Sequence, residues 1–439
     1  MFHYYIKGAK TFFQVSWIVL SEVTGYILSN DTTKEEFLES LTERLASINI
    51  LYVKIFQAIA LNNNIIDESM NNTLLKFTDN APWDKDDIDY DSLVELHEHF
   101  DVFFPNGYTP INSGMISLVF KCIIGYSNEI VIVKCKRKNI DEKLNDAIEN
   151  LRVMMYFLSC FPAFKKYNIQ DIVEKNIGLI KEQLCFKKEV KNLMLIKNNC
   201  KHLKYVKIPN VNVCVTQEFP NIIVMECING LPVHMLHKDD YVPFAKTVMK
   251  FGFVTTLIHG ATHGDLHSGN ILFIRDEMDE KYPHKIGVID FGILLKIDSL
   301  FKNKLFEIIS ELFTLPPRVI ADKILTSGII EPLDVIENLQ EDHKNAITDM
   351  LENIVEKTVS TSKQVNQVKI YEFLNNFHAY IKNNELYELG LRPSENFVKT
   401  QLALAMAHGI TMTLCENDYL NLADQVINEL FRVDLLGLN

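Results

Sequence analysis

The spacing of apolar positions divides the chain into a helical beginning, a strand-rich middle and a mostly helical end. Residues 1–80 carry apolar side chains at helical spacing, and an acidic stretch over 82–93 follows as a linker or helix entry. β-Branched runs characterise residues 94–230, and from Leu231 onward the pattern is helical except at the glycine-containing loops. We therefore expect three parts, with the bounds 1–85, 86–230 and 231–439.

Three apolar runs in the middle part predict strands. PINSGMISLVFKCII predicts two strands joined by a small-residue turn, and EIVIVKCKR predicts a third. A helical insert from Asp141 to about Lys201 separates them from NIIVMECINGLP, which predicts a buried strand that runs into a turn. This combination of a strand-rich part and helical parts indicates the α+β class.

The segment from Thr262 to Gly292 carries the candidate chemistry. It begins THGDLHSGNILFI and ends KIGVIDFG, so that Asn270 follows Asp265 by about five residues and Asp290 comes about twenty residues later. In this order and between strand-like runs, the three residues are typical of the catalytic and metal-binding loops of protein kinases. Asp265 can accept or orient the proton of an attacking hydroxyl, while Asn270 and Asp290 offer hard oxygen ligands to Mg²⁺ on ATP. The alternative, in which both aspartates only form turns, does not explain the paired spacing.

Upstream residues supply further parts of a nucleotide site. Lys134 ends a β-branched run, where a kinase carries the lysine that reaches the α- and β-phosphates. The alternative is a surface lysine that closes a strand. Asn112, Ser113 and Gly114 occupy the place of a phosphate-covering loop, although the sequence there is not G-x-G-x-x-G.

Five segments together resemble the UbiB-like atypical kinases, a family linked to coenzyme Q and prenyl-lipid metabolism. They are IVIVKCKRKNI, LCFKKEVKN, NIIVMECINGLP, THGDLHSGNIL and VIDFG, within a resemblance that extends over roughly residues 35–310. It implies a two-lobed protein-kinase-like fold with an N-terminal helical extension and a mostly helical C-lobe. It also implies a phosphotransferase or ATPase that binds ATP and Mg²⁺ between the lobes, with backbone groups from Glu226 to Ile228 against the adenine.

The resemblance adds three catalytic candidates. Lys54 and Gln57 hold the first and last positions of the family's Lys-x-Gly-Gln motif, in which Phe56 replaces the glycine here. Glu189 stands where the family implies an ion-pair partner for Lys134; the alternative is one more solvated glutamate of the KKEVK run.

Two further departures from the family pattern affect these expectations. Gln183 and Cys185 replace two acids that face the Lys-x-Gly-Gln lysine in the family, so Lys54 is expected to reach phosphate or Glu189 instead. Gly114 stands in a loop that is alanine-rich in the family, and a glycine there predicts a more flexible loop.

Charge and cysteine usage narrow the function classes. The formal net charge of −13 argues against a nucleic-acid-binding protein and against simple electrostatic attachment to anionic lipid. The eight cysteines are scattered without paired spacing, which favours reduced core residues of a cytoplasmic-type compartment over a disulfide framework or a zinc site.

The segment TFFQVSWIVLSEVTGYIL near the N-terminus is mostly apolar but is interrupted by Gln14, Glu22 and several hydroxyls. A spanning helix needs roughly 20 predominantly apolar residues, so we expect a helix packed on the rest of the protein, with a membrane-surface helix as the alternative. No clear signal or transit peptide is predicted. The expected location is cytoplasmic, with peripheral membrane contact as the variant.

Three functions remain open from the sequence. The first is an ATP-dependent phosphotransferase or ATPase, which the intact set Lys134, Asp265, Asn270 and Asp290 favours. The second is a non-enzymatic scaffold that binds nucleotide and presents its helical extension to a partner or a lipid. The third is a small-molecule kinase of the aminoglycoside or choline type, which shares the HGDLHxGN loop. The phosphate acceptor, whether protein, lipid, small molecule or water, has no signature in the sequence.

Overall fold

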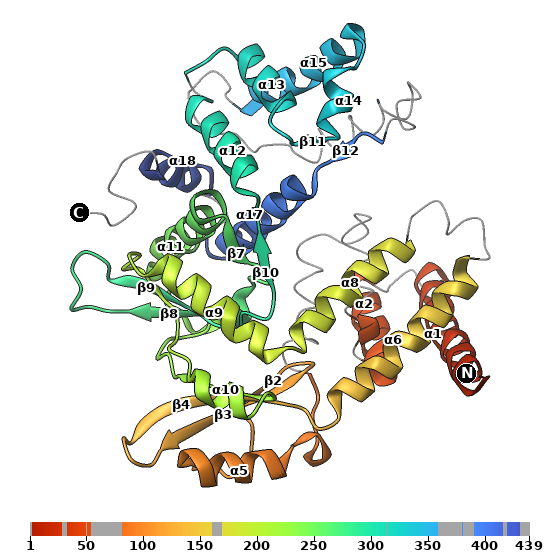
Figure 1. The fold of residues 1–439 in the computed structure, drawn as a ribbon, viewed down its shortest axis with the longest axis vertical. Coiled ribbons are helices and arrows are strands. Elements are labelled where there is room, and N and C mark those ends of the chain that lie inside the picture. Colours follow the sequence, from red (N-terminus) through yellow and green to blue (C-terminus); the bar gives the residue numbers. More distant parts are fainter. Residues whose placement is uncertain are drawn as a thin grey trace. The chain divides into compact units, whose positions relative to one another are not determined.

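The chain forms two compact units in the computed structural model. The first comprises Met1–Lys191 and Asn210–Cys227, and the second comprises Asn192–Pro209 and Ile228–Asn439. The structure describes residues 2–28, 33–49, 51–53, 81–159, 169–312, 314–358, 380, 390–415 and 419–430. Figure 1 shows a curved antiparallel sheet with helices in the first unit and a mostly helical second unit with small sheets.

The first unit is built on a five-stranded antiparallel sheet in the order β1-β3-β4-β6, with β2 paired to β3. Its strands are β1 (Val102–Phe103), β2 (Asn112–Ser113), β3 (Ser117–Ile124), β4 (Glu129–Lys136) and β6 (Ile222–Glu226). These bounds confirm the strands predicted from the three apolar runs. The long strands β3 and β4 are rich in β-branched and aromatic residues, which favour a pleated, half-buried surface.

Alternate residues of β4 enter different cores. Val133 and Cys135 pack with α5 (Tyr90–Phe100) and α10 (Val213–Glu218). Lys134, between them in sequence, therefore projects from the opposite face of the sheet. Its cross-strand partner Ile223 belongs to the second core, together with Phe186.

The remaining described helices of the first unit surround this second core. They are α1 (Phe2–Leu28), α2 (Lys34–Ile48), α6 (Ile140–Ser159), α8 (Ile169–Gln183) and the first part of α9 (Phe186–Cys200). The predicted helical insert is therefore at least three helices. α1 lies along α6 and beside α2, and Phe12, Val15 and Ile18 are its partly buried contacts with the core (Figure 1).

The second unit carries short strands around its loops. β5 (Val206–Lys207), β9 (His284–Val288) and β8 (Ile271–Arg275) form one sheet, in which β8 and β9 are antiparallel. β7 (Ala261–His263) pairs with β10 (Leu294–Lys296). The strand-like runs ILFI and KIGVI are thus confirmed as β8 and β9. The expectation that this part is helical outside its loops was wrong at β7, at β10 and at the pair of β11 (Ile330–Glu331) and β12 (Arg392–Pro393). These strands are too short to produce a visible alternation.

The other described elements of the second unit are mainly helices. In chain order they are α11 (Tyr241–Phe253), α12 (Ser299–Glu311), α13 (Pro317–Leu325), α14 (Leu333–Glu337), α15 (Glu341–Thr358), α17 (Glu395–Leu414) and α18 (Tyr419–Leu430), with the strands β11 (Ile330–Glu331) and β12 (Arg392–Pro393) among them. α11 lies against α17, where a Cβ on Gly252 would come within 2.5 Å of Ala407 Cβ (Figure 1). Pro317 begins α13 at a position whose nitrogen has no intrahelical partner, where proline is favoured.

Candidate active site

Lys134 and Glu189 form a buried ion pair in the first unit. Lys134 lies on β4 opposite Val119 of β3 and Ile223 of β6, so two neighbouring strands fix its backbone. Its Nζ is 2.7 Å from Oε1 of Glu189, and only 9% of the lysine and 2% of the glutamate are exposed. The predicted partnership is therefore present in the geometry, and the surface alternatives for both side chains are wrong.

Phe186 completes this pair, and sequence reasoning missed it. Its ring centroid lies 5.5 Å from Nζ of Lys134 and 5.8 Å from Nζ of Lys136. An ammonium group over an aromatic face is attracted by the ring's negative face. Phe186 precedes Glu189 by one helical turn on α9, and this spacing was the available signal that both side chains share a face.

The loop at 112–114 is held by several hydrogen bonds. Ser113 donates its hydroxyl to the carbonyl oxygen of Ala81 at 2.6 Å. Gly114 donates its amide to Ser117 O at 2.8 Å and accepts from Nε of Arg137 at 3.0 Å. The φ of Gly114 lies outside the left-handed region, and a Cβ there would meet only Ser117 O, at 3.8 Å. The backbone of Gly114 is thus one that alanine can also adopt, and both of its polar groups are bonded.

The residues predicted for the adenine-contacting hinge lie at the end of β6 and just beyond it. Glu226 donates its amide to Asn210 O at 2.8 Å, and its carboxylate accepts from the Asn210 side chain at 2.9 Å. That amide is already bonded, so it is not an open donor for a ligand. Ile228 is buried in the second unit, where its Cγ2 would come within 2.7 Å of a Cβ on Gly287. Its side chain packs, which leaves a ligand role only to its backbone.

The catalytic-loop residues lie together in the second unit. His263, at the end of β7, is buried; its Nδ1 accepts from the amide of Asp265 at 3.0 Å and its Nε2 lies 3.2 Å from Ile289 O. Burial lowers the pKa of His263, which keeps the ring neutral and suited to accept at one nitrogen and donate at the other. Gly264 allows a close approach, because a Cβ there would lie 2.4 Å from Ile293 Cγ2. Neither role was predicted from the sequence.

The two metal-ligand candidates are brought together by the backbone. The amide of Ile289 donates to Asn270 O at 3.0 Å, which places Asn270 beside the residue that precedes Asp290. Asn270 donates from Nδ2 to Asp265 O at 2.9 Å, so its amide is oriented by the catalytic loop. Asp290 adopts a left-handed φ of 59° and accepts from the amide of Gly292 at 3.1 Å. Such a conformation is uncommon outside glycine and often marks functional sites.

Asn192 supports the same segment and was also missed. Its Nδ2 donates to Phe291 O at 3.0 Å, with the asparagine 6% exposed. Asn192 follows Glu189 on α9, three residues further along the helix. The FKKEVKN motif thus supplies a partner for Lys134 and a donor for the Asp-Phe-Gly segment.

Some predicted residues are not brought together by the described structure. Lys54, Phe56 and Gln57 lie outside the described residues. Gln183 is the last residue of α8 and Cys185 is exposed.

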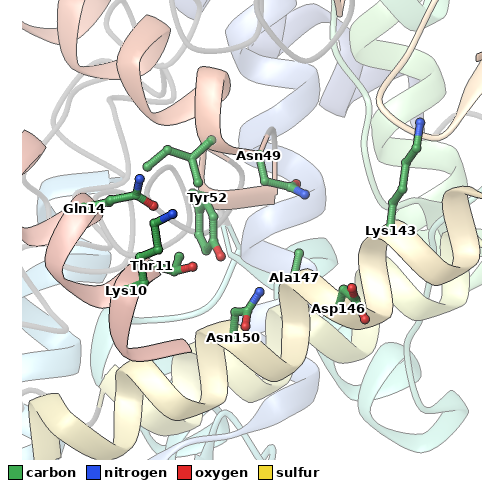
Figure 2. A pocket seen from close by; sticks show the side chains of 10 residues that line it. Lys10, Thr11, Gln14, Asn49, Tyr52, Lys143, Asp146, Ala147 and Asn150 are labelled. Atoms are coloured by element: carbon green, nitrogen blue, oxygen red, sulfur yellow. The ribbon is translucent and has the colours of Figure 1, made fainter. Parts of the chain in front are cut away.

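A separate cavity of about 420 Å³ lies among the N-terminal helices of the first unit (Figure 2). It is lined by Lys10, Thr11, Gln14, Ile48, Asn49, Tyr52, Lys143, Asp146, Ala147 and Asn150. Burial raises the pKa of Tyr52 to about 12, so its hydroxyl stays protonated. The lining set contains none of the residues predicted for the nucleotide.

A family model described as the ABC1 atypical kinase-like domain matches residues 79–322, more than half of the 439-residue chain. The chain belongs to this family. The resemblance to the UbiB-like atypical kinases that five segments indicated is confirmed.

Relatives of this ABC1-family chain are similar at low identity. The "Probable protein kinase UbiB" of Shewanella sp. (strain MR-7) is 24% identical over 306 residues, which cover 66% of this chain and 53% of the relative. The "Protein ACTIVITY OF BC1 COMPLEX KINASE 8, chloroplastic" of Arabidopsis thaliana is 22% identical over 249 residues, 55% of this chain and 31% of the relative. The match thus spans about half of the bacterial relative and a third of the plant one.

A solved structure supports the fold of the ABC1-family chain. The structure of the Rv3197–erythromycin complex from Mycobacterium tuberculosis aligns with a TM-score of 0.52 and 16% identity, covering 90% of this chain and 98% of that one. This likeness concerns the fold alone. Together with the family match, it confirms the predicted α+β, protein-kinase-like fold.

Proposed function

We propose that this ABC1-family chain is an atypical kinase or ATPase of UbiB type that binds Mg-ATP and transfers its terminal phosphate to an acceptor or to water. The observation that carries the proposal is the buried ion pair of Lys134 and Glu189. A buried salt bridge seldom stabilises a fold more than apolar residues of similar volume would. Lys134 of this pair lies on the strand that carries the phosphate-binding lysine in kinases, and this position favours a ligand role. In this role Glu189 and Phe186 hold the Lys134 ammonium toward the phosphate oxygens.

The second unit supplies the complementary groups in this proposal. Asn270 and Asp290 offer an amide and a carboxylate oxygen, and Mg²⁺ is commonly bound by one or two protein oxygens together with water and phosphates. The described residues contain no group of three or more His, Cys, Asp or Glu side chains that could hold a metal by themselves, so the phosphates would complete the coordination. Bound there, Mg²⁺ would neutralise charge on the phosphate oxygens.

Asp265 is the proposed catalytic residue. Its backbone is fixed by His263 and Asn270, so its carboxylate can be held ready to orient an attacking hydroxyl and accept its proton. Asn112, Ser113 and Gly114 are proposed to cover the phosphates, and the backbone from Glu226 to Ile228 to contact the adenine. Lys54 and Gln57 are proposed to act from the helical extension, as in the resembled family.

For the phosphate acceptor we propose a chemical class and not a particular molecule. The resemblance favours turnover linked to prenyl-lipid metabolism, including coenzyme Q, over phosphorylation of a protein. The scaffold alternative differs by predicting nucleotide binding without turnover. The small-molecule-kinase alternative predicts stimulation by an aminoglycoside or choline.

Peripheral attachment to a lipid surface is a second proposal, favoured by α1. Phe13, Trp17 and Leu20 are 69%, 66% and 61% exposed, and Ile27 continues the same stripe at 71%. The window Ala9–Leu28 is the one helix of the described chain that is long and apolar enough to cross a membrane by length and composition, which is weak evidence by itself. Only 11% of it is buried, so the expectation of a packed helix holds for one face alone. Flotation with neutral phospholipid vesicles tests the stripe: Trp17→Ser should weaken binding, and Leu402→Ser, at a single exposed apolar position of α17, should not.

ATP turnover by purified protein tests the main proposal. Asp265→Asn should keep Mg-ATP-induced thermal stabilisation and lower kcat by about 100-fold or more. Asp290→Asn should remove most of the stabilisation as well. Asp279→Asn is the matched control, because Asp279 pairs with Lys285 and accepts from the Tyr282 amide in a partly exposed turn outside the proposed site. Equal hydrolysis by the wild type and Asp265→Asn would reject the catalytic assignment; stabilisation without turnover in the wild type would favour the scaffold.

A further inference from the structure

We propose that Arg137 is a positioning residue that fixes the phosphate-covering loop by tying it to residues 81–87, the segment in which the N-terminal extension ends. The inference rests on the proposed function for the role of the loop, but the tie itself is a feature of the first unit alone. We call the set Ala81, Pro82, Asp87, Gly114 and Arg137 the Arg137 clamp.

The guanidinium group of Arg137 reaches both segments at once. Nε donates to Gly114 O in the loop at 3.0 Å. Nη1 donates to Pro82 O at 2.8 Å and to Asp87 Oδ2 at 2.7 Å, and Nη2 donates to Ala81 O at 3.2 Å. Arg137 is 8% exposed, so nearly all of its donors are satisfied by protein rather than by water.

Backbone and hydroxyl hydrogen bonds also join the loop to residues 81–87. The amide of Ala81 donates to Ser113 O at 3.1 Å, and the Ser113 hydroxyl donates back to Ala81 O at 2.6 Å. The amide of Arg137 donates to Ile116 O at 2.9 Å, and that of Lys138 to Asp87 O at 2.8 Å. The loop, the residues after β4 and the segment 81–87 are therefore joined by hydrogen bonds on several sides.

Asp87 is the charged partner that makes burial of Arg137 tolerable. It also accepts from Lys143 on α6 at 3.0 Å. Burial acts to raise the pKa of Asp87, but the Lys143 hydrogen bond and the Arg137 charge outweigh it, so the pKa is lowered and the carboxylate stays ionised. A guanidinium fork can serve four acceptors in fixed directions, whereas a lysine ammonium on its flexible stem cannot reproduce that geometry.

The clamp acts on the residue that the sequence marked as flexible. Gly114 has a backbone that alanine could adopt, and its carbonyl is the acceptor for Arg137. A loop held this way is preorganised, and preorganisation lowers the entropy cost of ligand binding. Because the extension ends within residues 81–87, a movement of these residues is transmitted to the loop through Arg137.

Arg137→Lys tests the clamp, with Arg152→Lys as the matched control. Arg152 also pairs with carboxylates, Glu149 and Glu174, but on the exposed side of α6. Arg137→Lys should raise KM for ATP by about tenfold while kcat changes by less than about threefold, as expected when ordering of a binding loop is lost. Backbone hydrogen exchange should rise in 81–87 and in 112–116 and stay unchanged in the second unit.

Asp87→Asn is a second variant that tests the Arg137 clamp if the Arg137→Lys protein does not fold. It removes the charge that accompanies Arg137 without altering the loop, so KM and exchange should shift in the same direction by a smaller amount. Unchanged KM and unchanged exchange in the two segments would overturn the inference. So would a uniform loss of protection with KM intact, because that is the signature of a purely structural residue. A wild type that neither binds nor hydrolyses ATP overturns the proposed function instead, and the exchange at 112–116 then still decides whether Arg137 fixes the loop.

Discussion

Nζ of Lys134 lies 2.7 Å from Oε1 of Glu189, between a sheet strand and the first turn of α9, with side-chain exposures of 11% and 3%. Both charges are therefore largely removed from water. They face each other, and the Lys134 ammonium also lies over the ring of Phe186. A pair in this setting is sensitive to the loss of either partner, since the remaining buried charge then loses its ion-pair partner. This sensitivity allows stability and nucleotide binding to be separated by experiment.

Glu189→Gln is expected to weaken both properties. Loss of the counter-charge should lower the free energy of unfolding by about 3 kcal/mol and raise KM for ATP by about tenfold or more. Urea unfolding and steady-state kinetics measure the two effects. Glu182→Gln is the control, because Glu182 pairs with Lys188 at the surface, and its change should stay below about 1 kcal/mol.

The double variant Lys134→Met with Glu189→Leu sharpens this prediction. Replacing a buried pair by apolar residues of similar size should restore most of the stability that Glu189→Gln loses. ATP binding should nevertheless be lost, since no ammonium is left to meet the phosphates. A double variant that still binds Mg-ATP like the wild type would show that Lys134 is a structural residue.

Phe186→Leu should loosen Lys134 without removing the ion pair. A cation–π contact contributes roughly 0.5–2 kcal/mol, so ATP affinity should fall by about threefold or more. Isothermal titration measures the affinity. Phe273→Leu, a fully buried phenylalanine that packs on Phe244, should lose similar stability but little affinity. Equal affinity losses in the two variants would mean that general core packing is responsible.

Acidification should destabilise the second unit through His259. Burial, assisted by the charge of Lys302, lowers the pKa of His259, and its Nδ1 is buried without a hydrogen-bond partner among the described residues. A base whose pKa is lower when folded gives stability that is present above the unfolded value of 6.5 and is lost as pH falls below it. The loss can reach about 1.4 kcal/mol per pH unit for one such group.

His259→Phe removes that titration, so unfolding free energies measured from pH 7.5 to 5.5 should decline less steeply than in the wild type. Partly buried His408, whose pKa is also lowered by desolvation, contributes to the slope that remains. His237→Phe serves as the control, because His237 is exposed. An identical slope in His259→Phe and wild type contradicts the prediction.

Gly114→Ala should stabilise the protein. Because the native backbone suits alanine and the new Cβ has room, the main effect is a smaller conformational freedom of the unfolded chain, about 0.4–1 kcal/mol. Gly230→Ala is the contrast, since its Cβ would lie 2.9 Å from Leu272 Cβ and 3.1 Å from Phe273 O. Urea midpoints should therefore move in opposite directions. A destabilised Gly114→Ala would show that the loop needs glycine.

Motifs with local spacing could be predicted, and contacts between distant segments could not. The strands around Lys134 and the order of Asp265, Asn270 and Asp290 follow from alternation and from fixed intervals along the chain. Asn192 was missed because its importance arises from an acceptor about one hundred residues away, at Phe291. Arg137 was missed for the same reason, since a basic residue after a strand looks solvated until its acceptors at 81–87 are known.

The flexibility expected at Gly114 is a case in which residue type alone did not predict the folded backbone. Glycine is permissive, but permissiveness concerns what a backbone can do in isolation. In the folded unit the amide and the carbonyl of Gly114 are both bonded, and the conformation is an ordinary one. Residue type therefore predicted the range of possible conformations, while neighbours determined which one is adopted.

The exposed apolar stripe on α1, formed by Phe13, Trp17, Leu20 and Ile27, has a consequence for purification and assays. Such a helix adsorbs to air–water interfaces, plastic and detergent micelles, and it promotes concentration-dependent self-association. A low soluble yield of a variant would then indicate adsorption or self-association through this stripe before it indicates misfolding of the kinase fold. Assays should therefore compare variants in a background that carries Trp17→Ser, which removes the largest exposed side chain of the stripe and so reduces adsorption.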